Sequence, residues 1–311
     1  MKYDLIGDIH GHSKSLCALL EKLGYRERED AYTHPDRRAI FLGDFIDRGP
    51  GQREVIAVVR PMIERESAMA VMGNHEFNAI GYATNTPDGE SHLRQHSEKN
   101  KNQHRAFLDT YVSCNSAYKD VINWFKTLPL WLDLDGLRVV HACWDRDAMA
   151  RLAPKLKPDN RLTEDLLIES STPGTAAYRD METILKGKEL RLPNGASFRD
   201  KEGNERHEIR IRWWDNTVTN YRDAFMGPES ARTHIPADPL GTDHEMGYGH
   251  HEPSVFLGHY WLEGNPEPLA RNIACLDYSV AKPGGSLVAY RWDGEETIDV
   301  GKFVSVRRRE A

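Results

Sequence analysis

Five short apolar runs, each ending on a residue that can bind a metal ion, constrain the fold of this chain more than any other feature. The runs are YDLIGDIH, AIFLGDFIDRG, MAVMGNHE, LRVVHA and SVFLGHYW. Glycine directly precedes the polar residue in four of them, at Gly7, Gly43, Gly73 and Gly258. In folds that alternate strands and helices, functional groups gather at the carboxyl ends of the strands. We therefore expect these five ends to converge on one site.

Strand and helix patterns alternate along the first part of the chain. An apolar run at 3–6 predicts a strand, and leucines at helical spacing between 16 and 23 predict a helix that stops at Gly24. Runs at 39–42 and 68–72 flank a predicted helix at 55–63, and further strands are expected at 137–142, 254–259, 272–278 and 286–292. This alternation predicts an α/β or closely related mixed fold, in which crossovers join parallel strands.

The length and the polar segments define the expected domain organisation. At 311 residues the chain could form one large domain or two small ones. We find neither an internal repeat nor a flexible linker that would divide it. Two strongly polar segments, at about 84–110 and about 146–251, interrupt the apolar pattern, and we interpret them as insertions. The sequence therefore predicts a single domain over residues 1–311.

Charge and composition exclude several classes of protein. The formal net charge of −7 argues against bulk binding of nucleic acid or of an anionic membrane, since either would need a basic surface. The sequence has neither a signal-peptide pattern nor an apolar stretch approaching the roughly 20 residues of a membrane helix, so we expect a cytoplasmic location. Four scattered cysteines without a CxxC spacing predict buried free thiols in a reducing compartment: Cys17, Cys114, Cys143 and Cys275.

The residue types at the ends of the runs indicate a dinuclear metal site. Asp8 and His10 are two residues apart, so in an extended strand end both side chains point to the same side and can bind one cation. The two carboxylate oxygens of Asp44 can bridge two ions. The other runs add one amide oxygen and two imidazoles, which suit manganese, iron, zinc or cobalt better than calcium: Asn74, His141 and His259.

Further polar groups beside these ligands indicate the reaction. His75 follows Asn74 directly, and Asp47 with Arg48 follows Asp44 closely. A histidine oriented by a carboxylate can protonate a departing oxygen, and an arginine can bind two oxygens of a phosphate group. Together these groups favour phosphoryl transfer to water.

Each motif alone has a simpler interpretation. Asp8 and His10 could form a hydrogen-bonded turn, Asn74 could cap a helix, and His141 could be a histidine satisfied at a strand end. Because all the motifs occur in one chain, we favour the metal site over these alternatives.

The motifs GDIHG, GDFIDRG and GNHE, followed by an isolated His and by GH, resemble those of calcineurin-like metallophosphoesterases. The resemblance is to the branch that holds phosphoprotein phosphatases and bis(5'-nucleosyl)-tetraphosphatases, and CLDYSVAKPGGSLVAYRW is similar to the closing hairpin on the tetraphosphatase side. It covers roughly residues 1–82, 130–142 and 254–311. The resemblance implies two packed mixed β-sheets flanked by helices, with the site at one edge of the sandwich.

The resemblance also implies a role for each site residue. One ion is expected on Asp8, His10 and Asp44, and a second on the bridging Asp44 with Asn74, His141 and His259. His75 is implied as the general acid, paired with Asp47, and Arg48 as a phosphate-binding residue. Two divalent or trivalent ions are expected, manganese first and iron, zinc, cobalt or nickel as alternatives. They would present a bridging hydroxide that attacks phosphorus directly.

Other residues depart from the family pattern or leave their role open. The protein phosphatases of the family usually have small glycines after the fourth-motif histidine, whereas HACW follows here with Ala142, Cys143 and Trp144. Arg212 and Arg222 are candidates for a second phosphate-binding arginine. We interpret the histidines at 244, 250 and 251 as polar loop residues rather than a further metal site, and at least one of Trp213 and Trp214 as a core residue.

The substrate is the least defined part of the prediction, because insertions shape the substrate pocket. We favour phosphate monoesters, either phosphorylated Ser, Thr or Tyr in a protein or small phosphate esters. Alternatives are a dinucleoside polyphosphate such as diadenosine tetraphosphate, which the closing hairpin favours, and a nucleic-acid diester, which the net charge disfavours. An alternative of another class is a non-catalytic module that binds phosphate groups or nucleotides. No residue of the expected site is missing, which argues against such a module.

Overall fold

Two mixed β-sheets form the centre of the molecule. The computed structural model describes residues 1–199, 204–227, 229–241 and 247–309. The first sheet has the order β14-β15-β1-β4-β5 with β16 paired to β15, and the second has the order β13-β12-β7-β6. The strands of the first sheet are β1 Lys2–Ile6, β4 Arg37–Phe41, β5 Ala68–Ala70, β14 Asp277–Tyr278, β15 Ser286–Trp292 and β16 Phe303–Arg307. Those of the second are β6 Trp131–Leu134, β7 Leu137–Val140, β12 Ser254–Leu257 and β13 Ile273–Cys275.

Both sheets combine parallel and antiparallel pairs. Strand β1 is parallel to β4, with Leu5 opposite Ile40, and antiparallel to β15, with Leu5 opposite Tyr290. Strand β4 is parallel to β5, and β12 is parallel to both β7 and β13. The predicted mixed α/β class is therefore confirmed. The parallel strands place the carboxyl ends of β1, β4 and β5 at one edge of their sheet.

The two sheets pack face to face through alternate side chains. Leu5 and Ile40 of the first sheet lie in one buried cluster with Val139, Phe256 and Ala274 of the second, and all five are fully buried. Successive residues of a strand point to opposite faces, so the neighbours of these residues face the other way. Ile6 and Phe41 accordingly belong to a second cluster that includes helix residues. The two-sheet sandwich that the resemblance implies is present.

Helices cover the outer side of the first sheet. Helix α1 (Ser13–Leu23) packs against β15 and β16, and α2 (Gln52–Glu64) packs against β5. The leucines predicted to face the core from α1 are buried, and the helix ends at Gly24, whose φ of +97° suits a residue without a side chain. A short hairpin of β2 (Arg26–Arg28) and β3 (Ala31–Thr33) connects α1 to β4.

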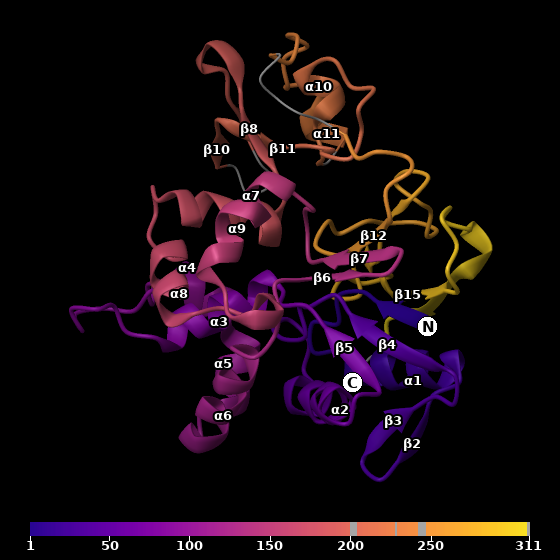
Figure 1. Ribbon diagram of the computed structural model, residues 1–311. Coiled ribbons are helices and arrows are strands. Elements are labelled where there is room, and N and C mark those ends of the chain that lie inside the picture. The colour runs from indigo at the N-terminus through magenta and orange to yellow at the C-terminus, as the bar shows by residue number, and fades with distance from the viewer. Residues whose placement is uncertain (200–203, 228, 242–246, 310–311) are drawn as a thin grey trace.

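The two polar insertions form ordered elements of their own, which Figure 1 shows around and above the two sheets. After α3 (Asn74–Ala83), the first insertion contains α4 Glu98–Gln103 and α5 Arg105–Tyr111, and α6 Asn115–Phe125 follows it. The second contains α7 Arg146–Leu152, α8 Glu164–Ser170, α9 Ala176–Lys186, β8 Glu189–Arg191, β9 Phe198–Arg199, β10 Glu205–Arg206, β11 Glu208–Arg210, α10 Tyr221–Ala224 and α11 Glu229–Arg232. Short 3-10 helices lie at Ala153–Lys155, Pro158–Asn160, Pro193–Gly195 and Val300–Lys302. The single-domain organisation remains our proposal.

The predicted strand at 272–278 is divided between the two sheets. Its first part is β13, which pairs with β12, and its last part is β14, which pairs with β15. Between them the Leu276 N–H donates to the carbonyl of Leu257, and a Cβ on Gly7 would lie 2.1 Å from the Leu276 carbonyl oxygen. Only a glycine at position 7 allows the chain to cross this close to β1.

Further sequence predictions concern two tryptophans and the four cysteines. Trp213 and Trp214 are both buried, and the Trp213 indole donates to the carbonyl of Ala142, so the interpretation that at least one of them is a core residue is confirmed. All four cysteines are free thiols, but only Cys143 and Cys275 are buried. Within the described ranges, none of the helices is long and apolar enough to cross a membrane.

Candidate metal centre

The residues predicted as metal ligands come together where strands of both sheets end. Asp8, Asp44 and Asn74 lie just beyond β1, β4 and β5, and His141 and His259 lie just beyond β7 and β12. Asp8, Asp44 and His141 expose 2% of their surface or less. The five apolar runs therefore converge as expected, and they do so at the edge shared by the two packed sheets.

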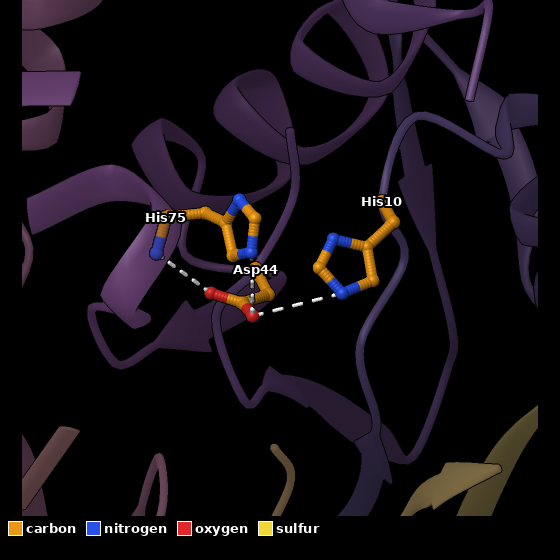
Figure 2. Close-up of side chains that lie close together, drawn as sticks. All are labelled: His10, Asp44 and His75. Carbon is orange, nitrogen blue, oxygen red and sulfur yellow. Dashed lines mark hydrogen bonds and ion pairs between the residues drawn. The ribbon is translucent and has the colours of Figure 1, made fainter. Parts of the chain in front are cut away.

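Asp44 occupies the middle of this group. Its Oδ2 lies 3.4 Å from Nε2 of His141, 3.7 Å from Nε2 of His10 and 3.9 Å from Nε2 of His75. Figure 2 shows the Asp44 carboxylate between the rings of His10 and His75. Candidate ligand atoms of His10, Asp44 and His75 all lie within 4.8 Å of one another, and so do those of Asp44, His141 and His259. Asp44 belongs to both sets, as a bridging carboxylate must.

Asn74 and Asp8 complete the two sets. The Oδ1 atom of Asn74 lies 2.8 Å from Nδ1 of His259 and 3.1 Å from Nε2 of His141. The Oδ2 atom of Asp8 accepts a hydrogen bond from the His259 backbone N–H at 3.0 Å. The structure thus brings together every ligand that the sequence predicts, and it also places His75 within reach of the first set.

Backbone carbonyls orient two of the imidazole rings. Nδ1 of His10 lies 3.0 Å from the carbonyl of Ile46, and Nδ1 of His141 lies 2.7 Å from the carbonyl of Leu42. A carbonyl can only accept, so in each ring we assign the proton to Nδ1. This leaves Nε2 of each ring, on the side of Asp44, as the nitrogen that would bind an ion.

Unpaired buried atoms test whether ions fit these residues. Among the described residues, Asp8 Oδ1, His10 Nε2 and His259 Nε2 are buried without a hydrogen-bond partner. Buried polar atoms are normally paired, and a bound cation would satisfy all three. The donor set combines oxygen and imidazole nitrogen, which suits manganese, iron, cobalt, nickel or zinc. The residues present therefore fit a pair of such ions.

The electrostatics of Asp44 agree with this role. Burial raises the pKa of its carboxyl, but the neighbouring imidazoles of His141 and His75 lower that pKa well below its usual value. The carboxylate is therefore ionised, which is the form that binds a cation.

Left-handed backbone conformations are concentrated at the site. The φ angles of His10, Asp44, Asp47, Arg48 and His259 are +46°, +50°, +70°, +68° and +71°. Residues other than glycine seldom adopt such angles, and each costs of order 1 kcal/mol or more, so the surrounding structure must impose them. Part of that constraint is visible, because the carbonyl of Asp44 accepts the N–H groups of both Ile9 and His10.

Two of the glycines that precede ligands are required by close packing. A Cβ on Gly258 would lie 2.0 Å from Oδ1 of Asp8, and a Cβ on Gly73 would lie 2.2 Å from Oδ1 of Asp44. Any side chain at either position would collide with a predicted ligand. The glycine pattern seen in the sequence is thus a consequence of how tightly the loops pack around the site.

Glu76 is a supporting residue that the sequence analysis missed. Its buried carboxylate accepts the backbone N–H groups of Asp44, Phe45 and Gly73 at 2.8, 2.9 and 3.0 Å. It therefore ties the loop after β4 to the start of α3. The N-cap of α3 is Gly73 and Asn74 is its first residue, so the alternative in which Asn74 caps a helix is wrong.

Two histidines share the carboxylate of Asp47. Nδ1 of His75 lies 2.6 Å from Oδ2, as the sequence predicts for a paired acid, and Nδ1 of His104 lies 2.8 Å from Oδ1. Burial raises the pKa of Asp47, but the bonds from His104 and His75 outweigh burial and lower it. His104 was not predicted: it comes from the polar insertion, 57 residues from Asp47, and only the fold reveals the contact.

The guanidinium of Arg48 lies over an indole ring beside the site. It lies 4.3 Å from the ring centre of Trp261, which also lies 5.6 Å from the ring of His10. The backbone N–H of Trp261 donates to Asp277 at 2.7 Å, and this bond anchors the aromatic residue. Cation–π contact leaves the N–H groups of the guanidinium edge free for an anion.

A cavity of about 1100 Å³ extends from these residues to both insertions. Asp44, His75 and Arg48 line one part, and the first insertion contributes Arg94 and His104 among others. The second insertion contributes further charged side chains and an aromatic pair: Arg191, Arg210, Phe198 and Phe225.

Neither proposed second arginine lines this cavity. Arg212 lies outside it, and Nε of Arg222 donates to the carbonyl of Ile235. His250 and His251 are exposed and join no metal-binding group among the residues described, and position 244 lies outside them.

Comparison with known proteins places the chain among phosphoesterases. Residues 1–267 match the family described as calcineurin-like phosphoesterase. A protein named bis(5'-nucleosyl)-tetraphosphatase PrpE (asymmetrical) from Geobacillus sp. (strain WCH70) is 32% identical over 191 residues, which are 60% of this chain and 75% of that protein. The protein of the same name from Halalkalibacterium halodurans is 46% identical over 76 residues, which span 24% of this chain and only 31% of that protein.

A solved structure shows the same fold. It is a protein serine/threonine phosphatase from Saccharomyces cerevisiae, with a TM-score of 0.52 and 14% sequence identity. The alignment covers all of this chain and 81% of that one.

Proposed function

Because the chain belongs to the calcineurin-like phosphoesterase family and is therefore a phosphoric ester hydrolase, we propose that it hydrolyses dinucleoside polyphosphates such as diadenosine tetraphosphate. Phosphate monoesters were the leading expectation from the sequence, and dinucleoside polyphosphates the alternative. The relatives from Geobacillus and Halalkalibacterium, both named as bis(5'-nucleosyl)-tetraphosphatases, favour the alternative. The structural observation that carries the proposal is the cavity, which continues from the metal centre well into both insertions.

The size and lining of the cavity support a substrate with several phosphate groups and a base. Ligand pockets usually measure about 300–1,000 Å³, so a volume of about 1100 Å³ far exceeds what one phosphate group needs. Arg48 and Arg94 can bind phosphate oxygens. Away from the centre, the rings of Phe198 and Phe225 lie 5.7 Å apart, nearly perpendicular, with Met226 also lining the wall. Aromatic and thioether side chains of this kind suit contact with a nucleobase.

We assign the metal ligands as the sequence predicts. Asp8, His10 and Asp44 would hold one ion, and the second would be held by Asp44 with Asn74, His141 and His259. When bound, the two ions supply an acidified water and positive charge next to the phosphate group. The distances around Asp44 and the unpaired nitrogens of His10 and His259 support this assignment.

His75 is the proposed general acid. Asp47 fixes its ring through Nδ1 at 2.6 Å, so that Nε2 is the nitrogen left to act on the substrate. Burial lowers the pKa of His75, but Asp44 and Asp47 outweigh burial and raise it, which favours the protonated ring. The Nε2–H can then donate its proton to the oxygen that leaves phosphorus.

Arg48 is the proposed ligand of the reacting phosphate group. The indole of Trp261 supports one face of its guanidinium, and no carboxylate within the described chain forms an ion pair with it. Its positive charge therefore remains available to oxygens of the substrate, where charge increases during transfer.

A phosphate monoester remains the second candidate. The metal centre, His75 and Arg48 would together bind one phosphate group, so these residues alone do not require a polyphosphate. What separates the two candidates is the part of the cavity built by the insertions.

The test compares substrates on one preparation. The manganese-loaded protein is assayed with diadenosine tetraphosphate, p-nitrophenyl phosphate, bis-p-nitrophenyl phosphate and a phosphopeptide, with His75→Ala as the inactive control. We expect the dinucleotide to have the highest kcat/KM. Higher kcat/KM for the monoesters would overturn the proposed substrate, and no turnover of any of the four would overturn the hydrolytic function.

The metal assignment is checked on the same variants by elemental analysis. Asp44→Asn should lose bound metal because the shared ligand is weakened for both ions, whereas His75→Ala should keep it. An Asp44→Asn protein with full activity and no metal would contradict the assignment.

A further inference from the structure

Arg94, in the first insertion, has neutral amides as its direct hydrogen-bond partners. Its Nη1 donates to Oδ1 of Asn78 at 2.7 Å, and its Nη2 donates to Oε1 of Gln103 at 2.8 Å. No ion pair links it to any carboxylate of the described chain within 4.0 Å. Two neutral amides therefore hold the guanidinium in place without cancelling its charge.

The position of Arg94 makes this arrangement costly unless an anion binds. The residue is half-buried and lines the same cavity as His75 and Asp44. Burial lowers the pKa of its guanidinium, and the charges of Glu182 and Asp47 offset this only in part. Two other cations that line the cavity are paired, Lys186 with Glu182 and Arg210 with Glu189. Arg94 differs from these two in having amides as its hydrogen-bond partners.

Helix α3 fixes Arg94 relative to the proposed acid. Asn78 follows His75 by three residues and Asn74 by four, so all three lie on neighbouring turns of one helix face. One turn rises about 5.4 Å. Asn78 is therefore about one turn of α3 from Asn74 and His75, and the guanidinium bonded to Asn78 lines the same cavity as His75.

This placement matches the leaving side of a phosphoanhydride. When a polyphosphate is cleaved, water forms a new bond to the attacked phosphorus while the bond from that phosphorus to the bridging oxygen breaks. The bridging oxygen keeps the electron pair and takes the proton of His75, and the water proton restores the acid. The leaving group is then itself a phosphate, with oxygens that a guanidinium can bind two at a time. In a monoester the leaving group is an alcohol, which offers no such oxygens.

We propose that Arg94 binds the phosphate group next to the attacked phosphorus and so makes the enzyme prefer phosphoanhydrides to monoesters. This inference rests on the proposed function, since it names the part of the substrate that the first insertion recognises. Asn78 and Gln103 act as positioning residues for the guanidinium.

The test is a selectivity ratio. The kcat/KM for diadenosine tetraphosphate is divided by that for p-nitrophenyl phosphate in the wild type, Arg94→Ala and Arg94→Lys. Loss of a charge-assisted bond should reduce the ratio about 10- to 100-fold in Arg94→Ala. Arg94→Lys should recover part of it, because lysine keeps the charge but lacks the planar fork. Arg105→Ala is the matched control, since Arg105 lies in the same insertion but outside the cavity.

Inhibition by inorganic anions gives a second readout that does not require turnover of the dinucleotide. Pyrophosphate and inorganic phosphate are measured as competitive inhibitors of p-nitrophenyl phosphate hydrolysis. We expect Arg94→Ala to weaken inhibition by pyrophosphate more than inhibition by phosphate. Equal losses for both inhibitors and both substrates in Arg94→Ala and Arg94→Lys would assign Arg94 a structural role only, and an unchanged ratio would overturn the inference.

The two proposals fail in different ways. If the wild type does not prefer the dinucleotide, the proposed function fails, but the comparison of pyrophosphate with phosphate still tests Arg94. If the preference is present and persists in Arg94→Ala, only the inference about Arg94 fails.

Discussion

Replacing His104 tests whether a residue of the insertion acts on catalysis through Asp47. His104→Ala removes the 2.8 Å contact to Oδ1 of Asp47 and leaves the 2.6 Å contact between Oδ2 and His75. Asp47 then has a buried oxygen without its partner and is free to turn. We expect His75 to be less well aligned with the leaving oxygen, whereas substrate binding should change little.

The magnitude follows from the kind of bond that is lost. A hydrogen bond to a charged group contributes about 1.5–3 kcal/mol, and about 1.4 kcal/mol is a factor of ten. If most of this contribution is needed to hold Asp47 in the transition state, kcat should fall about 10- to 100-fold and KM should change by less than about threefold.

The assay compares two leaving groups. Phenol is a poorer leaving group than p-nitrophenol and depends more on protonation, so the loss in His104→Ala should be greater with phenyl phosphate than with p-nitrophenyl phosphate. His104→Asn should recover activity, because its amide N–H lies near the position of Nδ1. His96→Ala is the control: this histidine is in the same insertion, but its ring bonds to the carbonyl of Tyr82.

His104 is buried and its ring lies 4.9 Å from that of Phe107, so a loss of stability must be distinguished from a loss of alignment. Thermal unfolding of each variant measures the loss of stability separately from the loss of activity. An equal loss of kcat with both leaving groups, or no recovery in a folded His104→Asn protein, would refute the reasoning.

Two further predictions concern the site and the stability of the fold. Gly258→Ala should lose bound metal while keeping its helix content, because the new Cβ would lie 2.0 Å from Oδ1 of Asp8. Elemental analysis measures the metal and circular dichroism the helix content. Gly241→Ala is the control and should keep its metal, because no atom lies within 4 Å of the added Cβ. A hydrogen bond from Arg37 lowers the pKa of Asp293 from 3.8 to about 2, so the stabilisation by this ionised carboxylate should be complete above about pH 4 and lost as the pH falls toward 2. Urea unfolding of wild type and Asp293→Asn should therefore differ at neutral pH and converge in acid, and a constant difference would contradict the assignment.

The residues that the sequence could predict share one property: their position depends on local pattern. Asp8, Asp44 and His141 follow apolar runs, and the end of a strand is visible from its own residues. Parallel pairing then brings the strand ends to one edge without further information. The glycines before four of the ligands are visible in the sequence, but the close packing that requires them is seen only in the structure.

The supporting residues could not be predicted because their contacts are not local. His104 and Arg94 lie in a polar insertion without periodic apolar residues, so its sequence does not indicate which way their side chains point. The hydrogen bonds to Asp47 and Asn78 join them to residues outside that insertion. Glu76 lies within a recognised motif, but two of the three N–H groups that it accepts belong to a loop 31 and 32 residues away. The division of 272–278 between two sheets likewise depends on how Gly7 meets Leu276.

The hydrogen bonds between the ligand loops bear on how ions enter and leave. The Asp44 carbonyl joins the loops after β1 and β4, the Gly258 N–H donates to the His141 carbonyl, and the His259 N–H donates to Asp8. Because the chain itself makes these bonds, an arriving ion has little polypeptide to order, and its release should not unfold the protein. A single batch stripped by a chelator can therefore be reloaded with each ion in turn, and differences in activity will report the ions rather than the yield of refolding.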